Sequence, residues 1–263
     1  MRSDRVDLPI RERAEIERSA VEASHSGSEA LGAAENQIRR YLNPPANTPY
    51  PLEYCFHLLG DVARKAVLDF GCGSGVHTLL LARRGADVLA FDISRDLIEI
   101  ARRRLAVNGL GSARFFVSSA HDLALADASV DLVLGVAILH HLELTRVARE
   151  LKRILRTGGR AIFQEPVRNS KMIQFVRDLI PYRAPDVSPF ERPLTDEELR
   201  AFASGFSRYR SRPFWLPHVN LASILPVVRD YCVHPLVRLD GRVLARFPGL
   251  AYYASIRVIE LVK

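Results

Sequence analysis

Short hydrophobic runs alternate with amphipathic stretches between residues 60 and 167 of the chain. The hydrophobic runs read KAVLDF, ADVLAFD, ARFFVSS, VDLVLGVA and GRAIFQEP. Between them, the spacing of hydrophobic positions predicts helices at about residues 76–84, 94–108 and 143–156. Strands separated by helices are typical of βαβ units. We therefore predict an α/β fold with a doubly wound, mostly parallel sheet and helices on both of its faces.

Several residues mark where these helices begin and end. Ser94 is a predicted N-cap, because its hydroxyl can accept a hydrogen bond from the first turn. Gly109 and Gly158 are predicted C-terminal stops, because glycine readily adopts the left-handed conformation that ends a helix. Thr195 lies three residues before Glu198 and predicts a capping box at the start of a further helix.

The segments outside this region are less regular. Four prolines between residues 43 and 51 exclude both a helix and a central strand there. The remaining pattern predicts helices at 9–24, 33–42, 171–180, 220–231 and 237–247, and strands at 207–215 and 254–262.

The composition is that of an ordinary globular protein, with 263 residues of which 48% are hydrophobic and 25% charged. The three cysteines, Cys55, Cys72 and Cys232, form no Cys-x-x-Cys pair, so we expect neither a zinc ribbon nor a disulfide framework. The first 20 residues lack the apolar core of a secretory signal, and no hydrophobic run is long enough to span a bilayer. A cytoplasmic location is therefore expected.

The net charge of +7 is unevenly distributed. Residues 1–199 carry 27 basic and 27 acidic side chains, whereas residues 200–263 carry 10 basic and 3 acidic ones. A basic surface of this kind can attract nucleic acid, anionic lipid or an acidic substrate, and it can also simply be solvated.

The sequence VLDFGCGSG, residues 67–75, leads from a buried strand through a glycine-rich turn into a helix. Gly71, Gly73 and Gly75 have no Cβ, so the backbone can turn sharply and approach a ligand closely. The following helix start offers free N–H groups. This arrangement suits a nucleoside lying across the carboxyl ends of the strands, although glycine-rich turns also occur for conformational reasons alone.

A second feature narrows the ligand class. Asp92 ends the next hydrophobic run, 21 residues after Gly71, where a carboxylate can accept hydrogen bonds from ribose hydroxyls. Val76 occupies the position at which a dinucleotide fingerprint requires glycine, and the chain has no Gly-Lys-Ser/Thr of a P-loop. Asp69 would repel a pyrophosphate and would favour a ligand with an amino group or a sulfonium.

Four motifs in order resemble those of the class I S-adenosylmethionine (SAM)-dependent methyltransferases of small molecules. They are VLDFGCGSG, VLAFDIS, the 118–142 stretch that ends in LHHL, and LKRILRTGGRAIFQEP. The resemblance implies a seven-stranded Rossmann-like sheet, with SAM as cofactor and S-adenosylhomocysteine as product. It also implies an N-terminal helical cap at 1–59 and a methyltransferase domain at 60–263, with lid insertions at about 167–194 and 215–250.

The same resemblance assigns cofactor-binding residues. It places Asp69, Gly71, Cys72, Gly73 and Gly75 around the methionine moiety, Asp92 on the ribose, Ile93 against adenine, Ser119, Ala120 and His121 at the adenine edge, and Gly135 beside the sulfonium. Ser119 departs from the family, which often has aspartate there, but a hydroxyl can also accept from the adenine amino group. The fourth strand is not followed by an Asn-Pro-Pro-Tyr or Asp-Pro-Pro-Tyr motif, which weakens an adenine-DNA or glutamine methyltransferase reading.

The catalytic candidates are His140 and His141, directly after the fourth strand. Imidazole can remove a proton from a hydroxyl or an acidic carbon, although such a pair can also cap a helix or pack. We expect no metal site, because adjacent side chains point apart and no third ligand is evident. Glu165, Tyr41 and Tyr50 are candidate substrate contacts, with strand capping or packing as their alternative roles.

The sequence thus predicts a SAM-dependent methyltransferase acting on a small organic acceptor through an O, N or C nucleophile. A nicotinamide-dependent oxidoreductase and a cofactor-binding regulatory protein without catalysis remain open, as do lipid-like and nucleic-acid acceptors. The arginine-rich stretch 219–250 predicts either peripheral membrane contact or a packed pair of lid helices. The chain has no added nucleic-acid-binding module and no aromatic–basic stacking pattern, which argues against a nucleic-acid partner.

Overall fold

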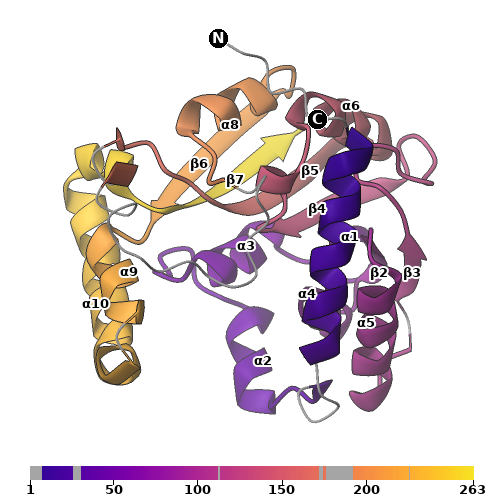
Figure 1. Ribbon diagram of the computed structural model, residues 1–263, viewed down its shortest axis with the longest axis horizontal. Coiled ribbons are helices and arrows are strands. Elements are labelled where there is room, and N and C mark those ends of the chain that lie inside the picture. Colours follow the sequence, from indigo (N-terminus) through magenta and orange to yellow (C-terminus); the bar gives the residue numbers. More distant parts are fainter. Residues whose placement is uncertain (1–7, 26–30, 112, 172–173, 176–191, 225) are drawn as a thin grey trace.

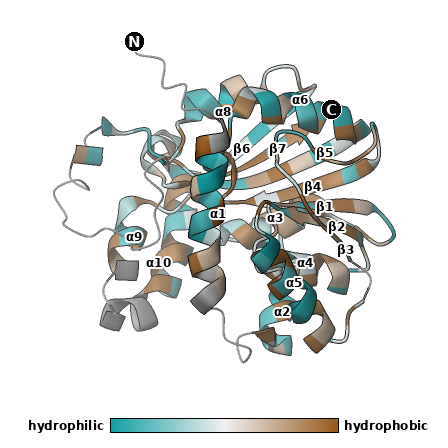
Figure 2. Cartoon of the chain, turned by 45° about the vertical axis from the view of Figure 1, so that its right-hand side comes forward, coloured by the Kyte–Doolittle hydropathy of each residue, from teal (hydrophilic) through white to brown (hydrophobic). Residues whose placement is uncertain are grey.

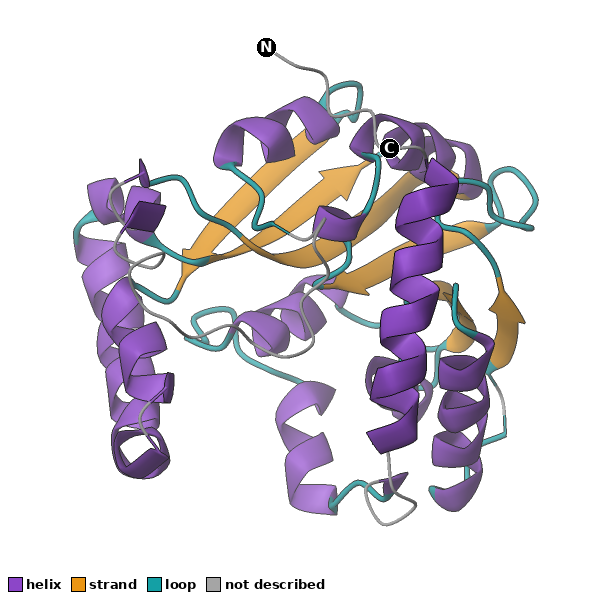
Figure 3. Cartoon of the chain, in the orientation of Figure 1, coloured by secondary structure: helices purple, strands orange, loops and turns teal. Residues whose placement is uncertain are grey.

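A seven-stranded sheet runs through the middle of the protein, with helices on both of its faces (Figures 1 and 3). The structure is a computed structural model that describes residues 8–25, 31–111, 113–171, 174–175, 192–224 and 226–263. The strand order is β3-β2-β1-β4-β5-β7-β6, and β7 is antiparallel to both of its neighbours, β5 and β6. The doubly wound, mostly parallel α/β fold predicted from the sequence is confirmed.

Every predicted strand has a counterpart. The strands are β1 (Ala66–Phe70), β2 (Asp87–Asp92), β3 (Arg114–Val117), β4 (Val130–Val136), β5 (Leu155–Pro166), β6 (Arg208–Phe214) and β7 (Ile256–Val262). The helices are α1 (Leu8–His25), α2 (Glu35–Leu42), α3 (Pro51–Leu59), α4 (Val76–Arg83), α5 (Arg95–Val107), α6 (Leu144–Ile154), α8 (Asp196–Ala203), α9 (Pro217–Ile224) and α10 (Pro226–Arg246), with 3₁₀ turns η2 (Leu139–His141) and η3 (Pro248–Tyr253).

The sheet separates two hydrophobic cores, because successive strand side chains point to opposite faces. In β1, Leu68 and Phe70 belong to the core covered by α6 and α8, whereas Val67 belongs to the core covered by α3 and α4. Both faces of the central strands are therefore buried, which explains why these strands read as continuous hydrophobic runs.

The local helix signals are borne out. Ser94 precedes α5, and its hydroxyl accepts a hydrogen bond from the backbone N–H of Leu97 at 3.3 Å. Thr195 and Glu198 form the predicted capping box at the start of α8. Gly109 has a φ of +70° just after the end of α5, as the predicted C-terminal stop requires.

The prediction that Gly158 ends a helix was wrong. We predicted a helix to residue 156 with Gly158 as its stop, but α6 ends at Ile154 and β5 begins at once at Leu155. Leu155 pairs with Val130, whereas Arg160 pairs with Leu132, so residues 156–159 of β5 lie opposite Asp131 alone and form a bulge. Gly158 has a φ of +75° within this bulge, where its conformational freedom serves the strand and not the helix.

The sequence analysis assigned no helix to residues 51–59, where the structure has α3. The helix begins at Pro51, in the first turn that proline tolerates, and packs against β5 and β7. The helices predicted at 220–231 and 237–247 correspond to α9 and to one continuous helix, α10, that includes Pro235. Most of the predicted helix at 171–180 and of the predicted lid insertion at 167–194 lies outside the described residues.

We expect Gly75→Ala to destabilise the fold by about 2 kcal/mol or more. Gly75 has a φ of +82°, and a Cβ there would lie 2.7 Å from the Cβ of Ala101 on α5. Gly111→Ala is the matched control, because a Cβ there would meet nothing within 4 Å and Gly111 has no positive φ. Urea unfolding of both variants tests this, and equal losses of unfolding free energy would contradict it.

Candidate active site

A cavity of about 360 Å³ lies at the carboxyl ends of β1, β2 and β4, beneath α1. This volume is within the range of small-molecule sites. The described residues that line it include nine of those predicted from the sequence: Gly71, Gly73, Asp92, Ile93, Ser119, Ala120, His121, His140 and His141. The βα loops thus bring motifs from four parts of the chain to one place.

Asp92 joins the glycine-rich loop to the end of β2. Its carboxylate accepts one hydrogen bond from the backbone N–H of Gly73 and one from that of Ser94, both at 2.9 Å. Burial raises the pKa of Asp92, while these hydrogen bonds and the charge of Arg18 oppose the rise. Each carboxylate oxygen retains a second acceptor direction, so the pair can take up the two hydroxyls of a ribose.

Asp69 lies below the glycine-rich loop at the end of β1. It is buried and accepts a hydrogen bond from the hydroxyl of Thr78 at 2.5 Å. Burial raises the pKa of Asp69 to about 7, and the nearby charge of Asp92 adds to the rise, while the Thr78 hydrogen bond opposes it. The group therefore titrates near neutral pH, and a cation bound beside it would favour its charged form.

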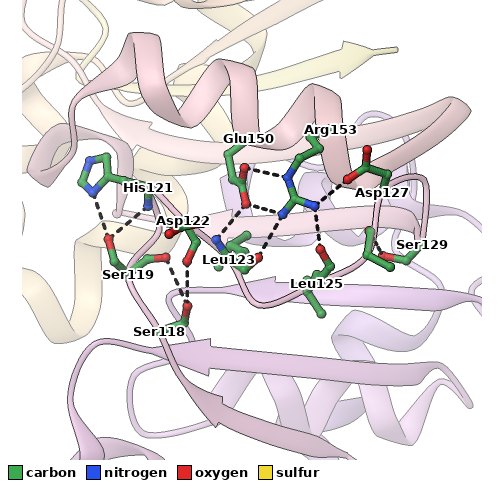
Figure 4. Close-up of polar contacts among 11 residues, drawn as sticks. Ser118, Ser119, His121, Asp122, Leu123, Leu125, Asp127, Ser129, Glu150 and Arg153 are labelled. Carbon is green, nitrogen blue, oxygen red and sulfur yellow. Dashed lines mark hydrogen bonds and ion pairs between the residues drawn. The ribbon is translucent and has the colours of Figure 1, made fainter.

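The loop after β3 is held by side chains of α6 (Figure 4). Glu150 accepts a hydrogen bond from the backbone N–H of Leu123 at 2.7 Å, and Arg153 donates to the carbonyls of Leu123 and Leu125. Arg153 also pairs with Glu150 and with Asp127. This network fixes the loop that presents Ser119, Ala120 and His121 to the cavity.

Helix α1 closes the cavity and contributes carboxylates to its wall. Glu12 accepts a hydrogen bond from the hydroxyl of Ser119 at 2.6 Å and lies 3.3 Å from Nδ1 of His121. Glu15 lies 3.0 Å from Nδ1 of His141. Burial raises the pKa of Glu15, but the contact with His141 and the charge of Arg18 outweigh it and leave the pKa below its usual value.

His140 is held by a fully buried carboxylate. Glu165, near the end of β5, accepts hydrogen bonds from the backbone N–H groups of Ile138 and Leu139 at 2.9 and 2.8 Å. Its other oxygen lies 2.8 Å from Nδ1 of His140. An ionised carboxylate only accepts hydrogen bonds, so Nδ1 of His140 is the donor in this contact.

The structure does not bring every predicted site residue to the cavity wall. Gly135 packs against Phe163, where a Cβ would approach the ring to 2.4 Å. Asp69, Cys72, Gly75 and Glu165 lie behind the wall. Tyr41 packs against Phe56, and the hydroxyl of Tyr50 lies 2.9 Å from Nδ1 of His234, so neither of these tyrosines lines the cavity.

The sequence analysis missed the side chains of α1. Those that line the cavity are Arg11, Glu12, Glu15, Arg18 and Ser19. Their spacing of three and four residues places them on one helix face, which is the signal that the sequence did contain. That signal does not say which part of the fold this polar face meets.

The comparisons with known proteins agree with the predicted fold and class of enzyme. Residues 68–163 match the family described as "Methyltransferase domain". The magnesium-protoporphyrin O-methyltransferase of Rhodobacter capsulatus is 35% identical over 116 residues, which are 44% of this chain and 51% of that protein. An uncharacterized methyltransferase of Mycobacterium bovis is 28% identical over 199 residues, which are 75% of this chain and 77% of that protein.

Solved structures show the same fold. The geranyl diphosphate C-methyltransferase of Streptomyces coelicolor A3(2), solved with Mg²⁺, geranyl diphosphate and S-adenosylhomocysteine, superimposes with a TM-score of 0.55 at 16% identity. The match covers 89% of this chain and 86% of that one. Residues 68–163 therefore form a methyltransferase domain, and the fold and the sequence relatives support a class I SAM-dependent methyltransferase. The oxidoreductase alternative is not supported.

Among the described residues, no helix is both long and apolar enough to cross a bilayer. No group of three or more histidine, cysteine, aspartate or glutamate side chains in the same part of the chain is arranged to hold a metal ion.

We expect SAM to bind more weakly as the pH falls from about 8 to about 6, by up to about tenfold. Asp69 has a pKa of about 7 without ligand, so it is mostly charged above this pH and mostly neutral below it. The cationic cofactor favours the charged form. Calorimetric titration across this pH range tests the expectation, with Asp69→Asn as the control, whose affinity should lose this dependence. An identical pH dependence in Asp69→Asn would contradict the assignment.

Proposed function

We propose that this enzyme transfers a methyl group from SAM to a hydroxyl group of a small organic acceptor, with His140 as the general base. The observation that carries the proposal is the contact between Nδ1 of His140 and the buried carboxylate of Glu165. This contact keeps Nε2 as the proton acceptor on a ring that lines the cavity.

Three parts of the cavity wall suit three parts of SAM: its ribose, its methionine moiety and its adenine. A ribose would be held by Asp92, whose oxygens each retain an acceptor direction beside the glycine-rich loop. Gly73 leaves room for a ligand at the loop, because a Cβ there would meet nothing within 4 Å, whereas a Cβ at Gly71 would meet the side chain of Ile138. Both glycines have positive φ values that other residues rarely adopt. Ile93 would pack against adenine, while Ser119, Ala120 and His121 would meet its polar edge.

The chemistry divides between cofactor and protein. SAM supplies an electrophilic methyl group, so the protein has to align the acceptor and manage one proton. In our proposal Nε2 of His140 takes the proton of the acceptor hydroxyl as the new oxygen–methyl bond forms and the sulfur–methyl bond breaks. Glu165 stabilises the resulting imidazolium and holds the ring in place, as a carboxylate does in other histidine-based sites. Helix α1 excludes water.

The comparisons support a small acceptor and leave its identity open. One relative is named as an O-methyltransferase of magnesium-protoporphyrin, and one structural neighbour as a C-methyltransferase of geranyl diphosphate. The cavity under α1, at about 360 Å³, favours a small molecule over a nucleic acid. The predicted contacts of Tyr41 and Tyr50 with substrate are not part of this proposal, because both side chains lie away from the cavity wall. The other remaining prediction, membrane contact through residues 219–250, concerns a different surface.

We expect His140→Ala to lower kcat for a hydroxyl acceptor by about 100-fold or more near neutral pH. The deficit should shrink as the pH rises, because the hydroxyl then ionises without help. Glu165→Gln should give a smaller loss with the same trend, because the amide can still contact the ring but cannot stabilise its charged form. The measurement is release of S-adenosylhomocysteine across a panel of hydroxyl, carboxylate and amine acceptors.

Calorimetric titration with S-adenosylhomocysteine is the control for folding and cofactor binding in these variants. Retained affinity with a pH-dependent loss of turnover supports the base role. Two results would contradict it: turnover equal to that of the wild type in His140→Ala, or a loss that does not change with pH.

A further inference from the structure

Helix α10 has a fixed inner face. The side chains of Val237, Asp240 and Leu244 are buried, and the carboxylate of Asp240 accepts hydrogen bonds from the backbone N–H groups of Trp215 and Leu216 at 3.0 and 3.2 Å. Buried side chains at these spacings lie on one side of a helix. The rotation of α10 about its own axis is therefore set by contacts with the chain that follows β6.

The outer face of α10 is basic. Arg238, Arg242 and Arg246 recur every four residues, so they form one exposed row on the helix. Asp240 is the only acidic residue between 233 and 253, and it belongs to the inner face. Among the described residues, no carboxylate pairs with any of the three arginines. Their charge is not neutralised within this part of the chain.

Hydrophobic side chains are exposed beside this row. Leu239 is 50% exposed, Phe247 is 56% exposed and Tyr252 of η3 is 50% exposed. Single exposed hydrophobic residues are common, but here several gather on and just beyond one helix. Figure 2 shows hydrophilic and hydrophobic residues side by side along α9 and α10, and Figure 1 shows these helices at one side of the protein, away from α1.

We propose that the α10 face, formed by Arg238, Leu239, Arg242, Arg246 and Phe247, binds the surface of an anionic lipid membrane. Guanidinium groups pair with lipid phosphates, while leucine and aromatic side chains enter the boundary between headgroups and acyl chains. A nucleic acid would satisfy the arginines but would give an aliphatic side chain such as Leu239 no comparable environment. The combination of charge and hydrophobic side chains favours the membrane.

This inference goes beyond the proposed methyl transfer and does not depend on the identity of the acceptor. Its consequence for the enzyme is access to acceptors that partition into lipid. The contact is peripheral, since the face is one side of an amphipathic helix and the hydrophobic side chains on it are few.

The test is co-sedimentation of the full chain with vesicles. Binding should be strong to phosphatidylcholine vesicles with about 30 mol% phosphatidylglycerol and weak to vesicles of phosphatidylcholine alone. Replacing Arg238, Arg242 and Arg246 together by glutamine should weaken binding to anionic vesicles by about 100-fold, at roughly fivefold per arginine. Raising the salt from about 0.05 to about 0.5 M should weaken wild-type binding as well.

A matched control removes the same charge elsewhere. Arg83 on α4, Arg149 on α6 and Arg200 on α8 are exposed, and replacing these three by glutamine gives the same net charge. This control should keep most of the vesicle binding if the α10 face is the contact. An equal loss in both triple variants would overturn the proposal, because net charge alone would then explain the binding.

A double variant tests the contribution of the hydrophobic side chains to vesicle binding. Replacing Leu239 and Phe247 by serine keeps every charge and should weaken vesicle binding by about tenfold or more. Unchanged binding would reduce the contact to a non-specific electrostatic one and contradict the proposal. Equal binding to neutral vesicles, or binding to a short DNA duplex and not to vesicles, would also contradict it. Titration with S-adenosylhomocysteine reports separately on folding and on the methyltransferase site.

Discussion

The carboxylate of Asp92 is the interaction on which the arrangement of the site depends. It accepts the backbone N–H of Gly73 on one side and that of Ser94 on the other, so it ties the loop after β1 to the end of β2. A buried carboxylate costs free energy unless it is hydrogen-bonded, and these two donors supply that compensation. The same group then presents its remaining acceptor directions to the cavity, so the interaction that shapes the loop also prepares it for a ribose.

The rest of the site follows the same principle, in which a buried polar group holds a loop by its backbone. Glu165 holds the turn after β4 and orients His140, while Glu150 and Arg153 hold the loop after β3. The strand order brings these loops to one edge of the sheet, because parallel strands end on the same side. Helix α1 then covers this edge and adds carboxylates from outside the core, so the site is walled by α1 as well as by the loops.

Local signals in the sequence were sufficient to predict the strands of the sheet and the loops after β1 and β2. The glycine-rich loop, Asp92 and Ser94 are recognisable because their chemistry depends on neighbours close in the chain. Contacts between distant segments were not predictable in this way: nothing local shows that Glu12 meets Ser119, or that Tyr50 meets His234 and not the cavity. Helix α3 was missed because it is short and follows a proline-rich stretch. Gly158 was assigned to a helix end because a bulge in β5 depends on pairing with β4.

Calorimetric titration with S-adenosylhomocysteine, on the wild type and on Asp92→Ala, tests the central claim most directly. The account predicts binding by the wild type and an affinity lower by about tenfold or more in the variant, since hydrogen bonds to a charged group are lost. Asp87→Ala, at the exposed start of the same strand, is the matched control and should bind as the wild type does. Equal affinity of a folded Asp92→Ala variant and the wild type would contradict the assignment of this carboxylate to the cofactor.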